Sequence, residues 1–205
     1  MSELVFYTNP QSRGRIVRWM LEECGATYRT VIIAYGPEMK TEPYASINPM
    51  GKVPAIVYAG KPVTETAAIC AFLADLYPAA KLAPPPEQRQ DYYRWMFFCS
   101  GPLEAAITDR MLGFVVPADK QRMTSYGDFD VAVEALAQKL RRTPYITGET
   151  FSAADVYVGS HVGYGLQFGT LPKLAEFEDY VARVSQRPAK LRADELDNAL
   201  LKPSQ

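Results

Sequence analysis

The stretch that decides the fold is NPMGKVPAI at residues 48–56, followed at residues 64–69 by TETAAI. The first segment joins a turn that contains proline and glycine to a short apolar run, 55–58, which is typical of a buried strand. Residues 61–63 can return beside that run as a second strand after the turn at 59–60. The apolar side chains that then recur at helical spacing are Ile69, Phe72, Leu73 and Leu76. The sequence therefore predicts two strands followed by a helix.

The start of this helix has polar residues that suit the binding of an anion. Thr64, Glu65 and Thr66 stand where the helix opens. The first backbone N–H groups of a helix have no partner within the helix, and they lie at the positive end of its dipole. We therefore expect the carboxylate of a ligand to bind at this helix start.

The residues before this stretch predict a strand, a helix and a second strand. An apolar run at 4–7 indicates the first strand, and the residues at 8–11, TNPQ, interrupt it. Ser12 precedes a helical pattern that Gly25 ends, and β-branched residues at 27–33 indicate the second strand. With the later strands and helix, this order is that of a thioredoxin-like domain.

Proline residues mark a boundary after this domain. Residues 78–86, PAAKLAPPP, cannot continue a helix and indicate a linker. No convincing strand pattern follows them. Helical patterns lie instead at 88–112, 122–142, 152–168 and 172–186, with a shorter one from Pro188. We therefore predict an α/β thioredoxin-like N-terminal domain followed by an all-α C-terminal domain. The predicted boundaries are 1–77 for the first domain, 78–87 for the linker and 88–205 for the second domain.

The third helix of the second domain has the clearest local start signal in the chain. Residues 152–155, SAAD, have the spacing of a capping box, in which a hydroxyl and an acidic side chain satisfy backbone N–H groups at a helix start. A cap of this kind stabilises a helix by ~1 kcal/mol. Asp155 is therefore expected to serve folding.

The composition limits the classes of function. The chain of 205 residues has a formal net charge of -1 and 48% hydrophobic residues, so it suits a globular core but offers no general attraction to nucleic acid or anionic membrane. No apolar run reaches the ~20 residues of a membrane span, and residues 1–4 lack the pattern of a secretory signal. Cys24, Cys70 and Cys99 are too scattered for a metal site or a CxxC motif. We therefore expect a cytoplasmic protein.

Several of these motifs occur together in one family. Residues 48–54 resemble the NPxGKVP turn of the cytosolic glutathione transferases, and residues 65–69 resemble their E-[ST]-x-A-I helix start. Residues 152–155 resemble the S-x-A-D box of the same proteins. The chain thus resembles a glutathione transferase of bacterial type over nearly its whole length.

The resemblance implies a group near the first helix that stabilises the thiolate of glutathione. A free thiol with a pKa of ~8.5 is only a few per cent ionised at pH 7, although the thiolate is the nucleophile. Ser12 combines a hydroxyl with an expected helix N-terminus, the neighbourhood in which related bacterial members place their thiol-activating residue. Tyr7 is an alternative because residues 13–15, RGR, resemble the R-G-R of tyrosine-type transferases, in which a tyrosine ends the first strand. Asn9 is a third candidate, because an amide can also donate to a thiolate.

The other contacts with glutathione are also carried over from the resemblance. Val53 is expected to offer its N–H and C=O to the cysteinyl part, as an added strand would, beside a cis Pro54. Glu65 is expected to pair with the γ-glutamyl ammonium, and Thr66 is expected to bind the carboxylate of the same residue. The candidates for the glycine carboxylate are Lys40 and Lys52.

The resemblance finally implies an activity. The electrophile pocket is expected between the domains, with Tyr93, Phe97, Met111 and Tyr164 as its candidate lining. The reaction would be attack of the glutathione thiolate on a small hydrophobic electrophile, a detoxification activity. Glutathione would be the co-substrate, with no metal or redox cofactor, and the protein would be a homodimer. Two alternatives stay open: a glutathione-dependent peroxidase or disulfide reductase, and a non-catalytic binding protein on the same fold.

Overall fold

The computed structural model describes residues 3–201, and its contacts divide the chain into two compact units. The first unit comprises the residues up to Leu82 together with those from Gln186 onward, and the second comprises Ala83–Ser185. The predicted helical domain, 88–205, also included the residues from Gln186 onward. The boundaries at 77 and 88 stay a prediction, and residues 1, 2 and 202–205 of the predicted domains lie outside the described chain.

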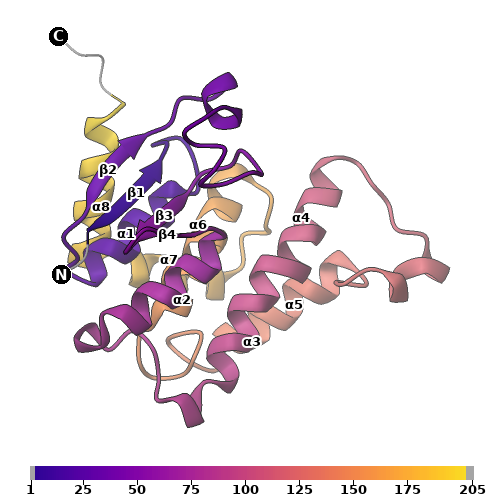
Figure 1. Ribbon diagram of the computed structural model, residues 1–205. Coiled ribbons are helices and arrows are strands. Elements are labelled where there is room, and N and C mark those ends of the chain that lie inside the picture. Colours follow the sequence, from indigo (N-terminus) through magenta and orange to yellow (C-terminus); the bar gives the residue numbers. More distant parts are fainter. Residues whose placement is uncertain (1–2, 202–205) are drawn as a thin grey trace. The chain divides into compact units, whose positions relative to one another are not determined.

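The first unit contains a four-stranded sheet in the order β2-β1-β3-β4 (Figure 1). Its strands are β1 (Leu4–Thr8), β2 (Arg29–Ile32), β3 (Ala55–Tyr58) and β4 (Lys61–Val63). β1 pairs with β2 in parallel, whereas the pairs β1–β3 and β3–β4 are antiparallel. The predicted strands are confirmed, and the order of elements is that of a thioredoxin-like domain.

Alternate side chains of β1 point to opposite faces of this sheet. Phe6 stands edge-on to Tyr28 and lies under the Arg18 guanidinium of the first helix, which is 5.2 Å from its ring. Tyr7 lies on the other face, where its ring is 5.7 Å from that of Tyr44. A buried cluster covers this second face, and its core is Ile33, Met39, Tyr44 and Ala55. The sheet therefore has a helix face and a face covered by the segment between β2 and β3.

The helices of the first unit are α1 (Gly14–Glu23), α2 (Thr66–Leu76) and α8 (Pro188–Ala199). α1 is the central one, since it contacts β1, α2 and α8. A short 3-10 turn at Pro37–Lys40 belongs to the covered face. Among the cysteines, Cys70 on α2 is fully buried and Cys24 after α1 is partly buried.

The second unit is helical, as predicted. Its helices are α3 (Gln90–Phe98), α4 (Glu104–Met111), α5 (Phe129–Leu140), α6 (Ala153–Phe168) and α7 (Ala175–Ser185). The single helix predicted at 88–112 is interrupted by a π-helical turn at Cys99–Leu103, which contains Pro102. Proline has no N–H to donate and its ring crowds the preceding turn, so the helix changes its hydrogen bonding there.

One predicted helix start is wrong. The segment expected to be helical from Arg122 forms a 3-10 turn up to Met123, and α5 begins only at Phe129. Gly127, in the segment between the two, has a φ of 67°, and the Asp128 carboxylate accepts the N–H groups of Asp130 and Val131. An aspartate in this position is a strong helix start signal. The helical periodicity of the residues before Asp128 led to the earlier start in the prediction.

The helix α6 forms the core of the second unit, because all of its first ten residues are buried. The predicted capping box is present, with the Asp155 carboxylate accepting the backbone N–H of Ser152 at 2.9 Å. The same carboxylate accepts the N–H of Ile146 and the hydroxyl of Tyr180. Burial raises the pKa of Asp155 to about 6, although the hydrogen bonds that its carboxylate accepts act in the opposite direction. Asp155 therefore ties the helix start to two other segments, and its structural role is confirmed.

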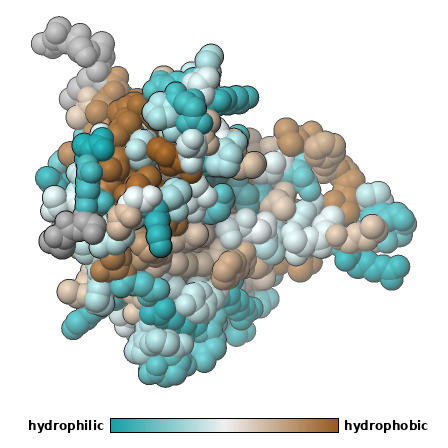
Figure 2. Space-filling view, in the orientation of Figure 1, coloured by the Kyte–Doolittle hydropathy of each residue, from teal (hydrophilic) through white to brown (hydrophobic). Residues whose placement is uncertain are grey.

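On the second unit, exposed apolar side chains include a group at the end of α4 and in the loop that follows it. Brown residues in Figure 2 gather over the end of α4 and the loop that follows it. Met111, Leu112, Phe114 and Val115 are all at least 65% exposed there. Among the described residues, no helix combines the length and the apolar character needed to cross a membrane.

Candidate functional site

The strand registers bring the sequence-predicted residues of the first unit to one edge of the sheet. Thr8 at the end of β1 is opposite Ile32 at the end of the parallel strand β2. Tyr7 is opposite Ala55, and Ile56 is opposite Val63. The segment after β1, the segment before β3 and the start of α2 after β4 therefore meet at the same edge. Ser12, Val53 and Glu65 belong to these segments.

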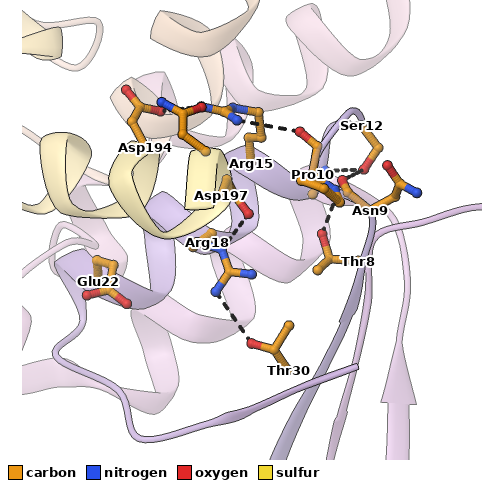
Figure 3. A network of polar contacts seen from close by, with 12 residues as sticks. Thr8, Asn9, Pro10, Ser12, Arg15, Arg18, Glu22, Thr30, Asp194 and Asp197 are labelled. Carbon is orange, nitrogen blue, oxygen red and sulfur yellow. Dashed lines mark hydrogen bonds and ion pairs between the residues drawn. The ribbon is translucent and has the colours of Figure 1, made fainter. Parts of the chain in front are cut away.

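A compact turn carries Asn9 and Ser12 from β1 into α1 (Figure 3). The Ser12 hydroxyl donates to the carbonyl of Asn9 at 2.7 Å and accepts the N–H of Gly14 at 2.9 Å. The Asn9 amide nitrogen donates to the carbonyl of Ile33 at 3.0 Å, and its amide oxygen accepts the N–H of Gln11. Ser12 lies just before the helix, which begins at Gly14, and its hydroxyl still serves that helix start.

Gly14 allows β1 and α1 to come this close. A Cβ atom at Gly14 would lie 1.9 Å from the hydroxyl oxygen of Thr8, which is fully buried. Any larger residue would push the first turn of α1 away from the strand. Burial in this contact leaves Thr8 unable to reach a ligand.

Tyr7 is placed differently from Ser12 and Asn9. It is half-buried within β1, and its ring packs against the buried cluster on the covered face of the sheet. Phe6, the preceding residue in β1, points to the opposite face of the sheet, toward α1. The structure thus brings Ser12 and Asn9 together in one turn after β1, whereas Tyr7 lies within β1 and packs against the cluster on the covered face.

The turn before β3 is held by two side chains that the sequence analysis did not single out. The carbonyl of Lys52 accepts the Tyr44 hydroxyl at 2.5 Å and the Asn48 amide at 2.8 Å. Burial raises the pKa of Tyr44 to about 12, so its phenol keeps the proton that it donates. Gly51 has a φ of 58°, and a Cβ there would lie 2.9 Å from the carbonyl oxygen of Met39. Only glycine fits both conditions.

This turn presents Val53 with unpaired backbone groups. The Val53–Pro54 peptide bond is cis, as predicted. Within the described chain, neither the N–H nor the C=O of Val53 makes a hydrogen bond. Because Val53 lies two residues before β3 and its backbone groups are unpaired, it is open to pairing with an extended ligand.

The predicted lysines flank the same turn. The side chains of Lys40 and Lys52 are both exposed. The Cγ atom of Lys40 would lie 3.1 Å from a Cβ at Gly51, so its aliphatic part runs beside the turn. Two cationic side chains therefore stand close to the open backbone of Val53.

The helix start at Glu65 and Thr66 has the features expected of an anion site. Glu65 is exposed and has a φ of 65°, a conformation that L-residues rarely adopt. The helix begins at Thr66 without a capping side chain and without an acidic residue in its first turn. The first hydrogen bond back to Glu65 comes from Ile69 at 2.8 Å, so among the described residues the N–H groups of 66–68 remain unpaired. An anion placed there would meet these donors.

The candidate pocket residues all belong to the second unit. Tyr93 and Phe97 lie one turn apart on α3 with ring centroids separated by 6.5 Å, and both are exposed. Met111 ends α4 and is also exposed, whereas Tyr164 on α6 is half-buried and 6.3 Å from the ring of Phe168. Their role stays a prediction. Within residues 3–201, no group of three or more histidine, cysteine, aspartate or glutamate side chains is placed to hold a metal ion.

Comparison with known proteins shows which proteins this chain is similar to. Residues 12–76 match the family model of the glutathione S-transferase N-terminal domain. The chain is 26% identical to glutathione S-transferase hmp2 of Hypomyces subiculosus, over 91% of this chain and 95% of that protein. It is 27% identical to an uncharacterized GST-like protein of Streptococcus mutans serotype c, over 78% of this chain and 66% of the length of that relative.

A solved structure agrees with these relatives. The theta class glutathione S-transferase of the citrus canker pathogen Xanthomonas axonopodis pv. citri, determined with glutathione bound, matches with a TM-score of 0.72 and 25% identity. The match covers 94% of this chain and 97% of that one. Residues 12–76 thus match the glutathione S-transferase N-terminal domain, and over most of its length the chain is similar in sequence and fold to proteins of that family.

Proposed function

We propose that the protein binds glutathione at this edge of the sheet and transfers its thiolate to small hydrophobic electrophiles. The observation that carries the proposal is the pairing of two open groups of donors. The unpaired backbone of Val53 comes just before β3, and the uncapped start of α2 at Thr66 comes just after its neighbour β4, at the same edge of the sheet. A peptide with a carboxylate at one end suits both groups.

Each part of glutathione then has a partner. The cysteinyl backbone pairs with the N–H and C=O of Val53, beside Pro54. The γ-glutamyl carboxylate binds the hydroxyl and N–H of Thr66, and the γ-glutamyl ammonium pairs with the Glu65 carboxylate. The residues proposed for the glycine carboxylate are Lys40 and Lys52.

Ser12 is the proposed stabiliser of the thiolate. Lowering a thiol pKa by ~2 units requires ~2.7 kcal/mol of preferential stabilisation of the thiolate. The Ser12 hydroxyl now donates to the neutral carbonyl of Asn9, so it must turn from that bond toward the sulfur. The exchange is favourable because a hydrogen bond to a charged acceptor is about twice as strong as one to a neutral acceptor. The bond from the N–H of Gly14 to the hydroxyl oxygen can persist, so it holds the oxygen in place.

The rest of the proposal concerns the second substrate and the assembly. Tyr93, Phe97, Met111 and Tyr164 are the proposed contacts of the electrophile. The protein would act as a cytoplasmic homodimer, with glutathione as its co-substrate and with no further cofactor.

Calorimetry with glutathione tests the site. Glu65→Ala should weaken binding by at least ~1.5 kcal/mol, the low end for a hydrogen bond to a charged group. Glu3→Ala is the matched control, because Glu3 is an exposed carboxylate at the opposite end of β1. Equal affinities of the two variants, with both folded, would contradict the proposed placement of glutathione.

The pH dependence of conjugation tests the donor. Ser12→Ala should need a higher pH to ionise bound glutathione, followed by thiolate absorbance, while Tyr7→Phe stays near the wild type. The reverse pattern would assign the role to Tyr7. No shift in either variant would point to Asn9 or to backbone N–H groups.

A further inference from the structure

The last helix, α8, pairs with α1 through charges that oppose the dipoles of both helices. α1 carries Arg15 near its start and Glu22 and Glu23 at its end, although a helix dipole favours the reverse order. α8 likewise has its basic residues early and its acidic residues late. Such patterns destabilise each helix alone. They become favourable only when the two helices lie antiparallel, because each charge then meets its opposite.

The observed contacts follow this antiparallel order. At the end of α1, Glu23 binds Arg187 through two bonds of 2.6 and 2.7 Å, and Glu22 binds Arg192 at 2.9 Å. In the middle, the buried guanidinium of Arg18 donates to the fully buried carboxylate of Asp197 at 2.6 Å. These contacts attach α8 along the whole of α1.

The contact at the start of α1 reaches the candidate site. One nitrogen of the Arg15 guanidinium donates to Asp194 at 3.1 Å and to the side-chain oxygen of Asn198 at 3.0 Å. The other donates to the carbonyl of Pro10 at 3.5 Å, within the turn that holds Asn9 and Ser12 (Figure 3). Arg15 therefore joins α8 to the turn that carries the proposed thiolate donor.

We propose that Arg15 is a positioning residue, and that Asp194 and Asn198 of α8 orient it so that the turn at 9–12 keeps the Ser12 hydroxyl in place. The inference rests on the proposed function in one respect, namely that this turn receives the sulfur of glutathione. It adds a dependence of that site on a helix more than 170 residues away in sequence.

The exposure of these contacts separates positioning from general stability. The side chains of Arg15 and Asp194 are 21% and 32% exposed, whereas those of Arg18 and Asp197 are 4% and 0% exposed. Partly exposed ion pairs contribute little to stability. The Arg18–Asp197 and Glu23–Arg187 contacts remain to hold α8 when the Arg15 contacts are absent. The Arg15 contacts can be removed without detaching the helix.

The test uses the double variant Asp194→Asn/Asn198→Ala in the full chain, with Arg192→Ala as the matched control. Arg192 pairs with Glu22 on the same two helices, at the end far from the site. Hydrogen exchange of the Ser12 and Gly14 N–H groups is measured in the free protein. The pH midpoint of thiolate formation is measured in the glutathione complex. Thermal unfolding shows whether both variants stay folded to the same degree.

The proposal expects effects in the double variant alone. Hydrogen exchange of the Ser12 and Gly14 N–H groups should become about tenfold faster, because local opening of the turn then costs less free energy. The thiolate midpoint should rise by about 0.5 pH unit or more, while Arg192→Ala keeps the wild-type values. A third variant, Arg15→Lys, should behave like the double variant, because an ammonium cannot reproduce the forked geometry of guanidinium.

Two results would overturn the inference: unchanged exchange in the double variant, or faster exchange with an unchanged thiolate midpoint. A wild-type protein that does not bind glutathione in calorimetry is a separate outcome. It would refute the proposed function, and the exchange measurement alone would then decide whether Arg15 positions the turn.

Discussion

At the scale of single residues, the backbone of Glu65 combines strain with a proposed binding role. Its φ of 65° places an L-residue in a conformation that costs about 1–3 kcal/mol. No side chain caps the helix that follows. Strain of this kind persists when the surrounding structure enforces it, and here the strand register and the start of α2 do so.

Glu65→Gly should therefore stabilise the fold and weaken the binding of glutathione. Glycine adopts the positive φ without strain, so the free energy of unfolding should rise by about 1 kcal/mol after the greater entropy of its unfolded chain is subtracted. Urea unfolding and calorimetry measure the two effects. Ala59→Gly is the control, because Ala59 also has a positive φ, of 50°, in a turn outside the site. It should stabilise the protein and leave binding unchanged, and a loss of stability in Glu65→Gly would contradict the expectation.

At this scale, sequence motifs predicted those parts of the candidate site that residues adjacent in the chain form together. Val53, Pro54, Glu65 and Thr66 lie in two short motifs, and the structure places both at one edge of the sheet. Tyr44 was missed, because its contact with Lys52 depends on how the segment before β3 folds back. Asn48 offered a signal, since an asparagine that opens a turn commonly bonds the backbone shortly after it.

At the scale of elements, two of the three glycines of α6, Gly163 and Gly165, occupy different environments. A Cβ at Gly165 would lie 2.5–2.9 Å from the side chain of Leu171, whereas a Cβ at Gly163 would meet Val181 at an ordinary 3.8 Å. Leu171 cannot withdraw easily, because its own N–H is bonded to the carbonyl of Gly165.

Gly165→Ala should therefore lower the free energy of unfolding by about 1–3 kcal/mol, as overpacking of a core does. Gly163→Ala should be neutral or stabilising by up to about 1 kcal/mol, since alanine favours the helix. Chemical denaturation of both variants provides the comparison. Similar values for the two would show that Leu171 can repack.

The buried pair between α1 and α8 gives a second prediction for elements. Asp197→Leu should lower the free energy of unfolding by about 3–5 kcal/mol, because it leaves the Arg18 guanidinium buried without its counter-charge. The double change Arg18→Met/Asp197→Leu should recover most of this loss, since apolar residues of similar size can replace a buried ion pair. Urea titration measures both. A double variant as unstable as the single one would contradict the expectation.

Helix boundaries show what local sequence can predict. The start of α6 was predicted because a capping box lies in four consecutive residues, 152–155. The start of α5 was misplaced because apolar periodicity continues upstream of the true cap at Asp128. The π-helical turn at Cys99–Leu103 was missed as well, since periodicity does not show how a helix accommodates Pro102. Caps are local signals, whereas such interruptions depend on packing.

At the scale of the whole molecule, the last helix belongs to the first unit, whereas the predicted domains placed it in the second. Helical periodicity predicted α8, but periodicity does not name a packing partner. The charges of α1 and α8, which oppose their own dipoles, were the available signal.

The assembly of the molecule remains a proposal that one measurement can test. We expect a homodimer, since closed two-fold assemblies are the commonest among soluble proteins. Light scattering at micromolar protein should give twice the chain mass of 22.9 kDa. A monomeric mass would contradict the expectation.

The return of α8 to the first unit also bears on how the protein is synthesised. Arg18 and Asp197 are 179 residues apart in the chain. At about 5–20 residues per second, the ribosome releases the arginine roughly 10–35 s before it makes the aspartate. The nascent first unit thus passes through a period in which a guanidinium destined for burial has no carboxylate to meet. The helical unit is translated during that delay, so it can be complete before the thioredoxin-like unit that precedes it.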